Sequence, residues 1–208
     1  MKKNIAMRVA AFLFVLTMVS ICTFATTFAK YTTTGSAEDS ARVAKWGVTV
    51  TAANEEGLFA SAYNDNKVKS EGSPAADVVA PGTSGSLAGF TVSGKPEVAV
   101  NVTYAATLTL TGWTVDSAEY CPIVFTVNGT KYLFTTNIAD LEDAVEDAIA
   151  AASASYDANT TISDTLSVSW AWAYSSSADN DVKDTALGNL ATAPTIELVV
   201  DCTVTQAQ

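Results

Sequence analysis

Histidine is absent from this 208-residue chain, and lysine and arginine together number only 11, against 22 acidic residues. Without histidine the chain lacks the commonest general base and the commonest zinc ligand. The sequence also has no C-x-x-C, H-E-x-x-H or G-x-S-x-G motif and no phosphate-binding loop. We therefore expect a protein that is not an enzyme, that needs no cofactor and that has no catalytic residues.

Basic residues are scarcer still beyond the N-terminus. Three of the 11, Lys2, Lys3 and Arg8, lie in the first 29 positions, so the rest carries 8 basic and 22 acidic residues, a net charge of -14. A charge of this sign repels nucleic acid and anionic membrane surfaces. We expect no nucleic-acid partner, and membrane contact only transiently through the N-terminal segment.

Cysteine is also rare. Cys22 lies in the N-terminal apolar segment, which leaves Cys121 and Cys202 in the remainder. An even pair in an exported chain permits one disulfide bond, but two buried thiols acting as small hydrophobic side chains fit equally well. The sequence leaves both alternatives open. A catalytic thiol is not expected, because no histidine is present to activate it.

The first 29 residues have the pattern of a secretory signal peptide. Basic residues precede an apolar run from Val9 to Phe24, and small residues precede a cleavage site between Ala29 and Lys30, with Ala25 as a second candidate. The alternative is an uncleaved anchor, because about 20 apolar residues span a bilayer. Polar and charged residues do not flank both sides of the segment, which favours cleavage and secretion to the extracellular matrix or cell surface.

Residues 30–40, KYTTTGSAEDS, are interpreted as an extended N-terminal arm. Tyrosine and threonine favour extended backbone, whereas Gly35 and the acidic pair Glu38 and Asp39 do not favour burial in a core. The residues expected to act in assembly are Lys30, Tyr31, Thr32, Thr33, Thr34, Gly35 and Ser36. The folded domain is expected to follow, from 41 to 208.

Period-two alternation of apolar and polar residues predicts most of that domain to be β-strands. Asn128-Gly129 predicts a type I′ hairpin over 121–134, with Phe125 opposite Tyr132 and Ile123 opposite Phe134. The longer strands are expected at 41–52, 87–93, 97–110, 161–174 and 194–206, with short strands at 58–63 and 78–79.

One amphipathic helix is predicted over 137–152, with Asn137 as its N-cap. Its solvent-exposed face is expected to consist of Glu142, Asp143, Glu146 and Asp147. A short second helical turn is predicted at 184–190. The fold class that these elements favour is all-β dominated: an antiparallel, jelly-roll-like β-sandwich with one inserted helix.

Two side-chain groups are candidate ligand sites. Trp170, Trp172 and Tyr174 share one face of a predicted strand and could stack on a sugar, although a sandwich core needs large side chains at the same positions. Asp179, Asp181 and Asp184 give an oxygen-rich loop and are a candidate calcium site, with a solvated turn as the default. Their spacing does not match an EF-hand loop.

The junction TFAKYTTTGSAEDSARVAKWGVTVTA resembles the start of the TasA/camelysin family of bacterial surface proteins, which are exported with a SipW-type signal peptidase. The stretch WAWAYSSSADNDVKDTALGNLA is similar to a segment of clostridial-type relatives in that group. Some camelysin relatives are described as metalloproteases, an activity that is not carried over because this chain has no histidine.

The resemblance implies a jelly-roll-like domain that polymerises into extracellular fibres of biofilm-matrix or cell-surface type. The arm of one subunit would complete the sheet of the next, which makes a homopolymer. The implied partners are copies of the chain itself, the SipW-type peptidase during export, and other matrix or cell-surface proteins. The alternative function is a monomeric cell-surface module that binds a ligand or glycan through the aromatic row or the acidic loop.

Overall fold

The computed structural model describes residues 12–14, 41–52, 58–59, 62–63, 68–69, 78–174 and 178–208. The chain divides into two compact units, Met1–Arg42 and Val43–Gln208. Apart from residues 12–14, which are helical, the expected signal peptide, its cleavage site at Ala29 and Lys30, and the arm at 30–40 lie outside the described residues. No helix within the described ranges is long and apolar enough to cross a membrane.

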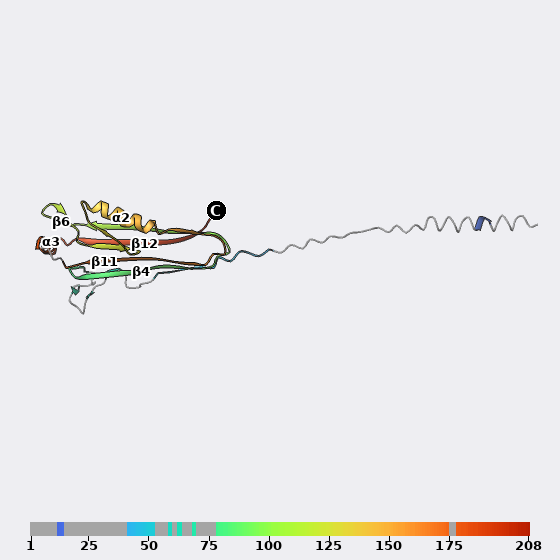
Figure 1. Ribbon diagram of the computed structural model, residues 1–208, viewed down its shortest axis with the longest axis horizontal. Helices are drawn as coiled ribbons and strands as arrows, with labels where there is room; N and C mark the ends of the chain where they lie inside the picture. The colour runs from blue at the N-terminus through green and yellow to red at the C-terminus, as the bar shows by residue number, and fades with distance from the viewer. Residues whose placement is uncertain are drawn as a thin grey trace, which may run out of the picture. The chain divides into compact units, whose positions relative to one another are not determined.

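The second unit is built from antiparallel sheets, so the predicted all-β class is confirmed. The larger sheet has five strands in the order β1-β4-β11-β8-β9. Their bounds are Val48–Ala52 for β1, Thr83–Gly94 for β4, Ile162–Trp172 for β11, Val124–Val127 for β8 and Thr130–Leu133 for β9. In Figure 1, β4 and β11 form the lower layer of this unit.

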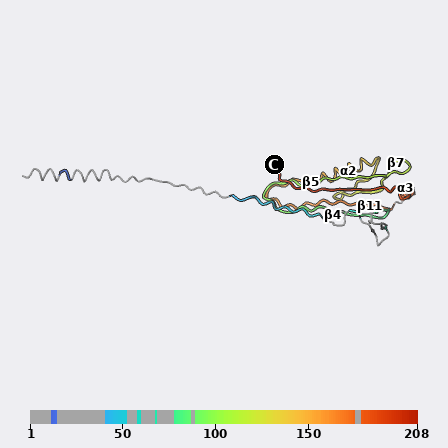
Figure 2. Tube along the Cα trace, turned by 180° about the vertical axis from the view of Figure 1, so that it is seen from behind, coloured from blue at the N-terminus to red at the C-terminus, as the bar shows by residue number. Residues whose placement is uncertain are grey.

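The smaller sheet has three strands in the order β10-β5-β12. Its strands are β10 (Ala154–Tyr156), β5 (Val100–Thr111) and β12 (Thr195–Gln206), and it faces the larger sheet, as Figures 1 and 2 show. Two short hairpins complete the strands: β2 (Ala62–Tyr63) with β3 (Val68–Lys69), and β6 (Thr114–Val115) with β7 (Ala118–Glu119).

The core lies between the two sheets. The alternation predicted for β5 is confirmed, because its even-numbered side chains are buried or half-buried and most of its odd-numbered ones are exposed. From the opposite sheet β11 contributes Ile162, Leu166, Val168, Trp170 and Trp172, all buried. Trp170 is also fixed at its polar end, where Nε1 donates a hydrogen bond to the carbonyl oxygen of Leu58 at 2.9 Å. Each large apolar side chain buried in this way stabilises the fold by about 1.5–3 kcal/mol.

The predicted helix is confirmed as α2, Ile138–Ala150. The Asn137 side chain caps it, with Oδ1 accepting a hydrogen bond from the backbone N–H of Asp140 at 2.7 Å. Its buried stripe is Ile138, Leu141, Val145 and Ile149, which packs against the core. Figure 1 shows α2 lying over the layer of the smaller sheet.

The Asn-Gly hairpin is also confirmed. Asn128 and Gly129 have φ values of 47° and 84°, the left-handed conformation that a type I′ turn requires. β8 and β9 flank the turn, and Phe125 lies opposite Tyr132 as predicted. The Asn128 side chain also accepts a hydrogen bond from the backbone N–H of Ser167 at 2.9 Å, which ties the turn to β11.

Several predicted boundaries are wrong. Residues 58–59 and 78–79, expected as strand, are not in a strand, and the strand expected from residue 87 begins at Thr83. The strand expected over 41–52 is β1, Val48–Ala52, and Trp46 is 43% exposed rather than part of the core. Within the described residues β1 pairs with β4 alone, at the edge of the sheet. Of its apolar side chains, Val48 packs against the core, whereas Val50 is exposed. The short turn expected at 184–190 is an eleven-residue helix, α3 (Ala178–Gly188), whose first turn carries two aspartates that favour a helix N-terminus.

A bulge in β4 depends on Gly89. Leu166 of β11 lies opposite Phe90, but Val168 lies opposite Leu87, so β4 contains one extra residue. Gly89 has a φ of +41°, and a Cβ atom there would overlap with the carbonyl oxygen of Leu166.

We expect Gly89→Ala to lower the free energy of unfolding by more than ~2 kcal/mol, because it adds left-handed strain and a backbone clash between two central strands. Urea unfolding followed by tryptophan fluorescence measures this. Gly188→Ala is the matched control, since nothing lies within 4 Å of a Cβ at that position. Equal stability of the two variants would contradict the assigned bulge.

Candidate functional site

The candidate site is the outer edge of β12. This strand is 12 residues long and is the last strand in the smaller sheet. Within the described part of the chain, β5 is its only pairing partner, along the full length from Thr195 opposite Thr111 to Gln206 opposite Val100. β12 therefore presents a long edge to which another strand could be added.

The side chains of β12 show that the core is incompletely covered here. The inward-facing residues pack against the core but are only half-buried, whereas their neighbours on β5 are mostly fully buried. These half-buried residues are Ile196, Leu198, Val200, Cys202 and Val204. A strand placed beside β12 would cover their exposed sides.

Hydrogen bonds of β5 show which backbone groups of β12 face the open edge. The N–H groups of Tyr104, Leu108 and Leu110 point to the α2 side of β5, so the odd-numbered residues of β5 bond to β12. Their register partners are the odd-numbered residues of β12. The N–H and C=O groups of the even-numbered residues 196–204 therefore face outward, on the same residues whose side chains face the core.

The opposite edge of the smaller sheet is covered. β10 pairs with β5 at residues 100–102. Farther along β5, backbone N–H groups donate to side chains of α2 and of Ser153, which follows α2. Leu108 N–H donates to Glu146 Oε1 at 2.8 Å, and Leu110 N–H donates to Glu142 Oε1 at 2.6 Å. The prediction that Glu142 and Glu146 lie on a solvent-exposed face is wrong, because they are half-buried against this edge; Asp143 and Asp147 are exposed as predicted.

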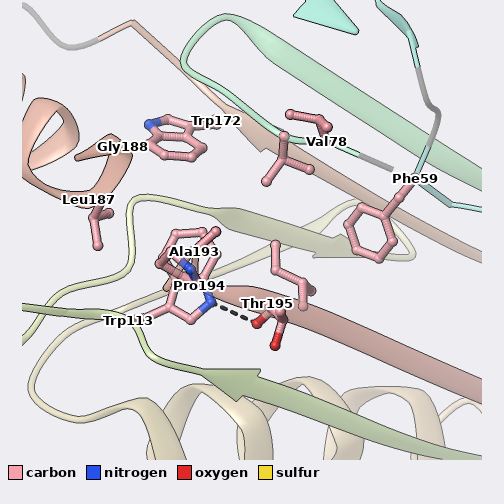
Figure 3. Close-up of a pocket in the computed structure, with 11 residues that line it drawn as sticks. Phe59, Val78, Trp113, Trp172, Leu187, Gly188, Ala193, Pro194 and Thr195 are labelled. Carbon is pink, nitrogen blue, oxygen red and sulfur yellow. Dashed lines mark hydrogen bonds between the residues drawn. The ribbon is translucent and has the colours of Figure 1, made fainter. Parts of the chain in front are cut away.

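A cavity of about 560 Å³ lies beside the first residues of β12. Figure 3 shows its aromatic walls, formed by Phe59, Trp113 and Trp172, with Pro194 and Thr195 along one side. Trp113 Nε1 donates to the Thr195 carbonyl oxygen at 2.9 Å, and the rings of Trp113 and Trp172 are 5.8 Å apart. The cavity is therefore apolar, with both indole N–H groups already hydrogen-bonded.

The aromatic row does not form an exposed platform. Trp170 and Trp172 are buried in the core, and only Tyr174 is exposed, at 79%. This supports the core interpretation of the two tryptophans over the sugar-stacking one.

The acidic residues of the candidate calcium site are separated by their environments. Asp184 is buried and accepts hydrogen bonds from the Tyr120 hydroxyl at 2.7 Å and from Trp172 Nε1 at 3.2 Å. Asp179 and Asp181 lie exposed in the first turn of α3. Among the described residues there is no group of three or more acidic or cysteine side chains placed to hold a metal ion.

Cys121 and Cys202 are both free thiols in this structure, which supports the thiol alternative over the disulfide. Cys121 is buried after β7, while Cys202 lies half-buried on β12 opposite Tyr104. Burial raises the pKa of the Cys121 thiol to about 12. The pKa of Cys202 is also raised, by burial and then by the charge of Asp164.

Comparisons with protein-family models, with curated proteins and with solved structures found no match to this chain. The site is therefore argued from its own geometry. Sequence analysis identified β12 as a half-buried strand, but alternation is the same whether a strand has one neighbour or two. Only the pairing in the folded chain distinguishes them.

Removal of one carboxylate tests whether the side chains of α2 accept hydrogen bonds from the edge of β5. Glu142→Ala leaves the Leu110 N–H without an acceptor, so we expect the free energy of unfolding to fall by about 1–3 kcal/mol. Asp143→Ala, one residue along on the exposed face, should change it by no more than about 0.5 kcal/mol. Chemical denaturation measures both. Similar losses in the two variants would contradict the hydrogen-bonding role of Glu142.

Thiol counting tests the cysteine assignment. A chain beginning at Lys30, unfolded in denaturant without reductant, should titrate two thiols with an aromatic disulfide reagent. In the folded chain Cys121 should react far more slowly than Cys202, because burial limits access and keeps its thiol protonated. Cys202→Ser isolates the Cys121 signal. A count of zero after unfolding would reinstate the disulfide.

Proposed function

We propose that this chain is an exported structural subunit of extracellular or cell-surface fibres. Subunits would join when the N-terminal arm of one pairs with the open edge of β12 in the next, completing a jelly-roll-like sandwich. The observation that carries the proposal is the contrast between the two edges of the smaller sheet. One edge is covered by β10 and α2, whereas β12 presents its backbone groups and half-buried side chains to an added strand.

The length of the arm and the distribution of its charges suit pairing with the edge of β12. Residues 30–40 form an eleven-residue segment, and β12 has 12 residues. In an extended conformation, one face of residues 30–38 would carry Tyr31, Thr33, Gly35 and Ala37, and the other would carry the charges of Lys30 and Glu38. An uncharged face toward the core and a charged face toward water suit a strand added at a sandwich edge. The resemblance to the TasA/camelysin family at residues 27–52 supports the same assignment.

The geometry of the second unit favours filaments over closed dimers. The chain enters the second unit at the end where β12 finishes. Glu97 N–H donates to the Lys45 carbonyl oxygen at 2.9 Å, Lys45 N–H donates to Glu97 Oε2 at 2.8 Å, and Ala207 N–H donates to the Ala99 carbonyl oxygen at 2.8 Å. β12 begins at the opposite end, near α3 and the apolar cavity. An arm that leaves one end and is accepted along a strand starting at the other end makes a head-to-tail contact, which propagates rather than closes.

The second candidate function is a monomeric cell-surface module that binds an apolar ligand. The observation in its favour is the cavity of about 560 Å³ lined by Phe59, Trp113 and Trp172, a volume in the range of small-molecule sites. Its discriminating feature is the state of the arm, which would have no partner in a monomer. Filament formation by the purified chain separates the two functions.

Polymerisation is tested with the chain that begins at Lys30. We expect filaments in negative-stain electron microscopy, and we expect deletion of residues 30–40 to give a folded monomer that forms none. Persistence of filaments after the deletion would contradict arm donation. A monomeric full-length mature chain under all conditions of time and pH would contradict the fibre function itself.

A proline pair tests the edge. Val200→Pro removes an N–H that faces the open edge and spares the ladder to β5, so the fold should survive and filaments should be lost. Lys131→Pro is the control, because the hairpin geometry points that N–H of β9 to the far edge of the other sheet. Filaments from both variants would show that the β12 edge is not the acceptor.

A further inference from the structure

Two buried oxygen atoms between the two sheets lack hydrogen-bond partners. Among the buried side-chain polar atoms of the described residues, they are the Tyr104 hydroxyl and Oδ2 of Asp164. Tyr104 is only 1% exposed. A buried polar group without a partner is destabilising, so such a pair in a native core calls for an explanation.

The two atoms belong to one polar cluster beside β12. Tyr104 lies on β5 directly opposite Cys202 of β12, and its ring is 6.4 Å from that of Phe90 in the facing sheet. Burial and the negative charge of Asp164 raise the pKa of Tyr104, as do smaller contributions from Cys202 and Tyr156. Burial and the neighbouring carboxylate of Asp164 also raise the pKa of Tyr156, which lies on β10. The cluster therefore spans the core from the covered edge to the open one.

The direction of an added arm follows from the proposed function. In a head-to-tail stack of like-oriented subunits, the arm enters where β12 begins and its first residue lies toward the end of β12. The arm would therefore run antiparallel to β12, and its uncharged face, which carries the odd-numbered residues 31–37, would face the core. Because the even residues of β12 also face the core, each inward arm residue lies opposite an inward β12 residue.

The charge of Asp39 selects the register. In an extended arm Asp39 would fall on the inward side, so registers that place it opposite Ile196 or farther along would put a carboxylate against the core. Sliding the arm the other way loses strand pairs. The register that keeps Asp39 just beyond Thr195 retains the most pairs without that cost. It places Tyr31 opposite Cys202, Thr33 opposite Val200, Gly35 opposite Leu198 and Ala37 opposite Ile196.

We infer that the buried pair formed by Tyr104 and Asp164 is a recognition site for the hydroxyl of Tyr31 on the arm of a neighbouring copy. The Tyr31 hydroxyl would donate to Asp164 Oδ2 and accept from the Tyr104 hydroxyl. Adjacent strands lie about 4.8 Å apart, so a side chain on the added strand must reach past β12. Serine and threonine are too short for this, and Tyr31 is the one aromatic residue of the arm. The inference rests on the proposed fibre function and adds the register between the arm and β12.

The test compares the lowest concentration that supports filaments, measured by sedimentation of chains beginning at Lys30. Tyr31→Phe keeps the ring and removes the hydroxyl, and should raise that concentration about tenfold or more. Tyr104→Phe should also weaken assembly while leaving the monomer equally or more stable to urea, because it removes an unpaired buried hydroxyl. Combined in one chain, the two changes should cost little more than either alone. Tyr132→Phe, on β9, is the matched control and should assemble like the unaltered chain.

The outcomes separate the inference from the function on which it rests. Unchanged assembly of Tyr31→Phe, or losses from Tyr31→Phe and Tyr104→Phe that simply add, would overturn the recognition site while filaments continue to support the fibre function. Absence of filaments from the unaltered chain would overturn the proposed function and the recognition site together.

Discussion

A strand at the edge of a sheet carries a row of backbone N–H and C=O groups that the sheet itself does not bond, and the smaller sheet of this protein handles its two edges in opposite ways. Along β5 the groups are bonded by β10, by Ser153 and by two glutamates of α2. Along β12 the described structure provides no such cover. The position of α2 and the proposed role of the arm both follow from this asymmetry.

The open edge also leaves the core unfinished on one side. β5 and β12 have the same alternating pattern, yet the inward side chains of β5 are mostly buried and those of β12 are half-buried. An added strand would finish the hydrogen-bond ladder and the apolar core in one step. Subunit folding and subunit association would then draw on the same surface, which links the stability of each copy to its place in a filament.

Polar groups inside the core have contrasting roles at the two ends of β12. Near its start, Asp184 is fully engaged by Tyr120 and Trp172 and serves the packing of α3. Farther along, Tyr104 and Asp164 each retain an unpaired oxygen atom. A slip of one residue turns every side chain of a strand to the other face, which apolar contacts prevent. A slip of two residues keeps the same side chains on the same face, so apolar contacts alone distinguish those two registers only weakly. A buried hydroxyl partner would supply that choice.

The sequence by itself determined the strand character of most of the second unit, the Asn128-Gly129 turn, the cap and buried stripe of α2, and the exclusion of histidine-based chemistry. These depend on short-range periodicity and local hydrogen bonds, which neighbouring residues specify. Only the tertiary structure decided that Glu142 and Glu146 face β5, that Cys121 and Cys202 stay unpaired, and that β12 has one neighbour instead of two. Each of these depends on which distant segments come together. The same alternation fits a strand with one neighbour or two, and the same glutamate can face solvent or bond to a strand, so neighbouring residues do not decide between them.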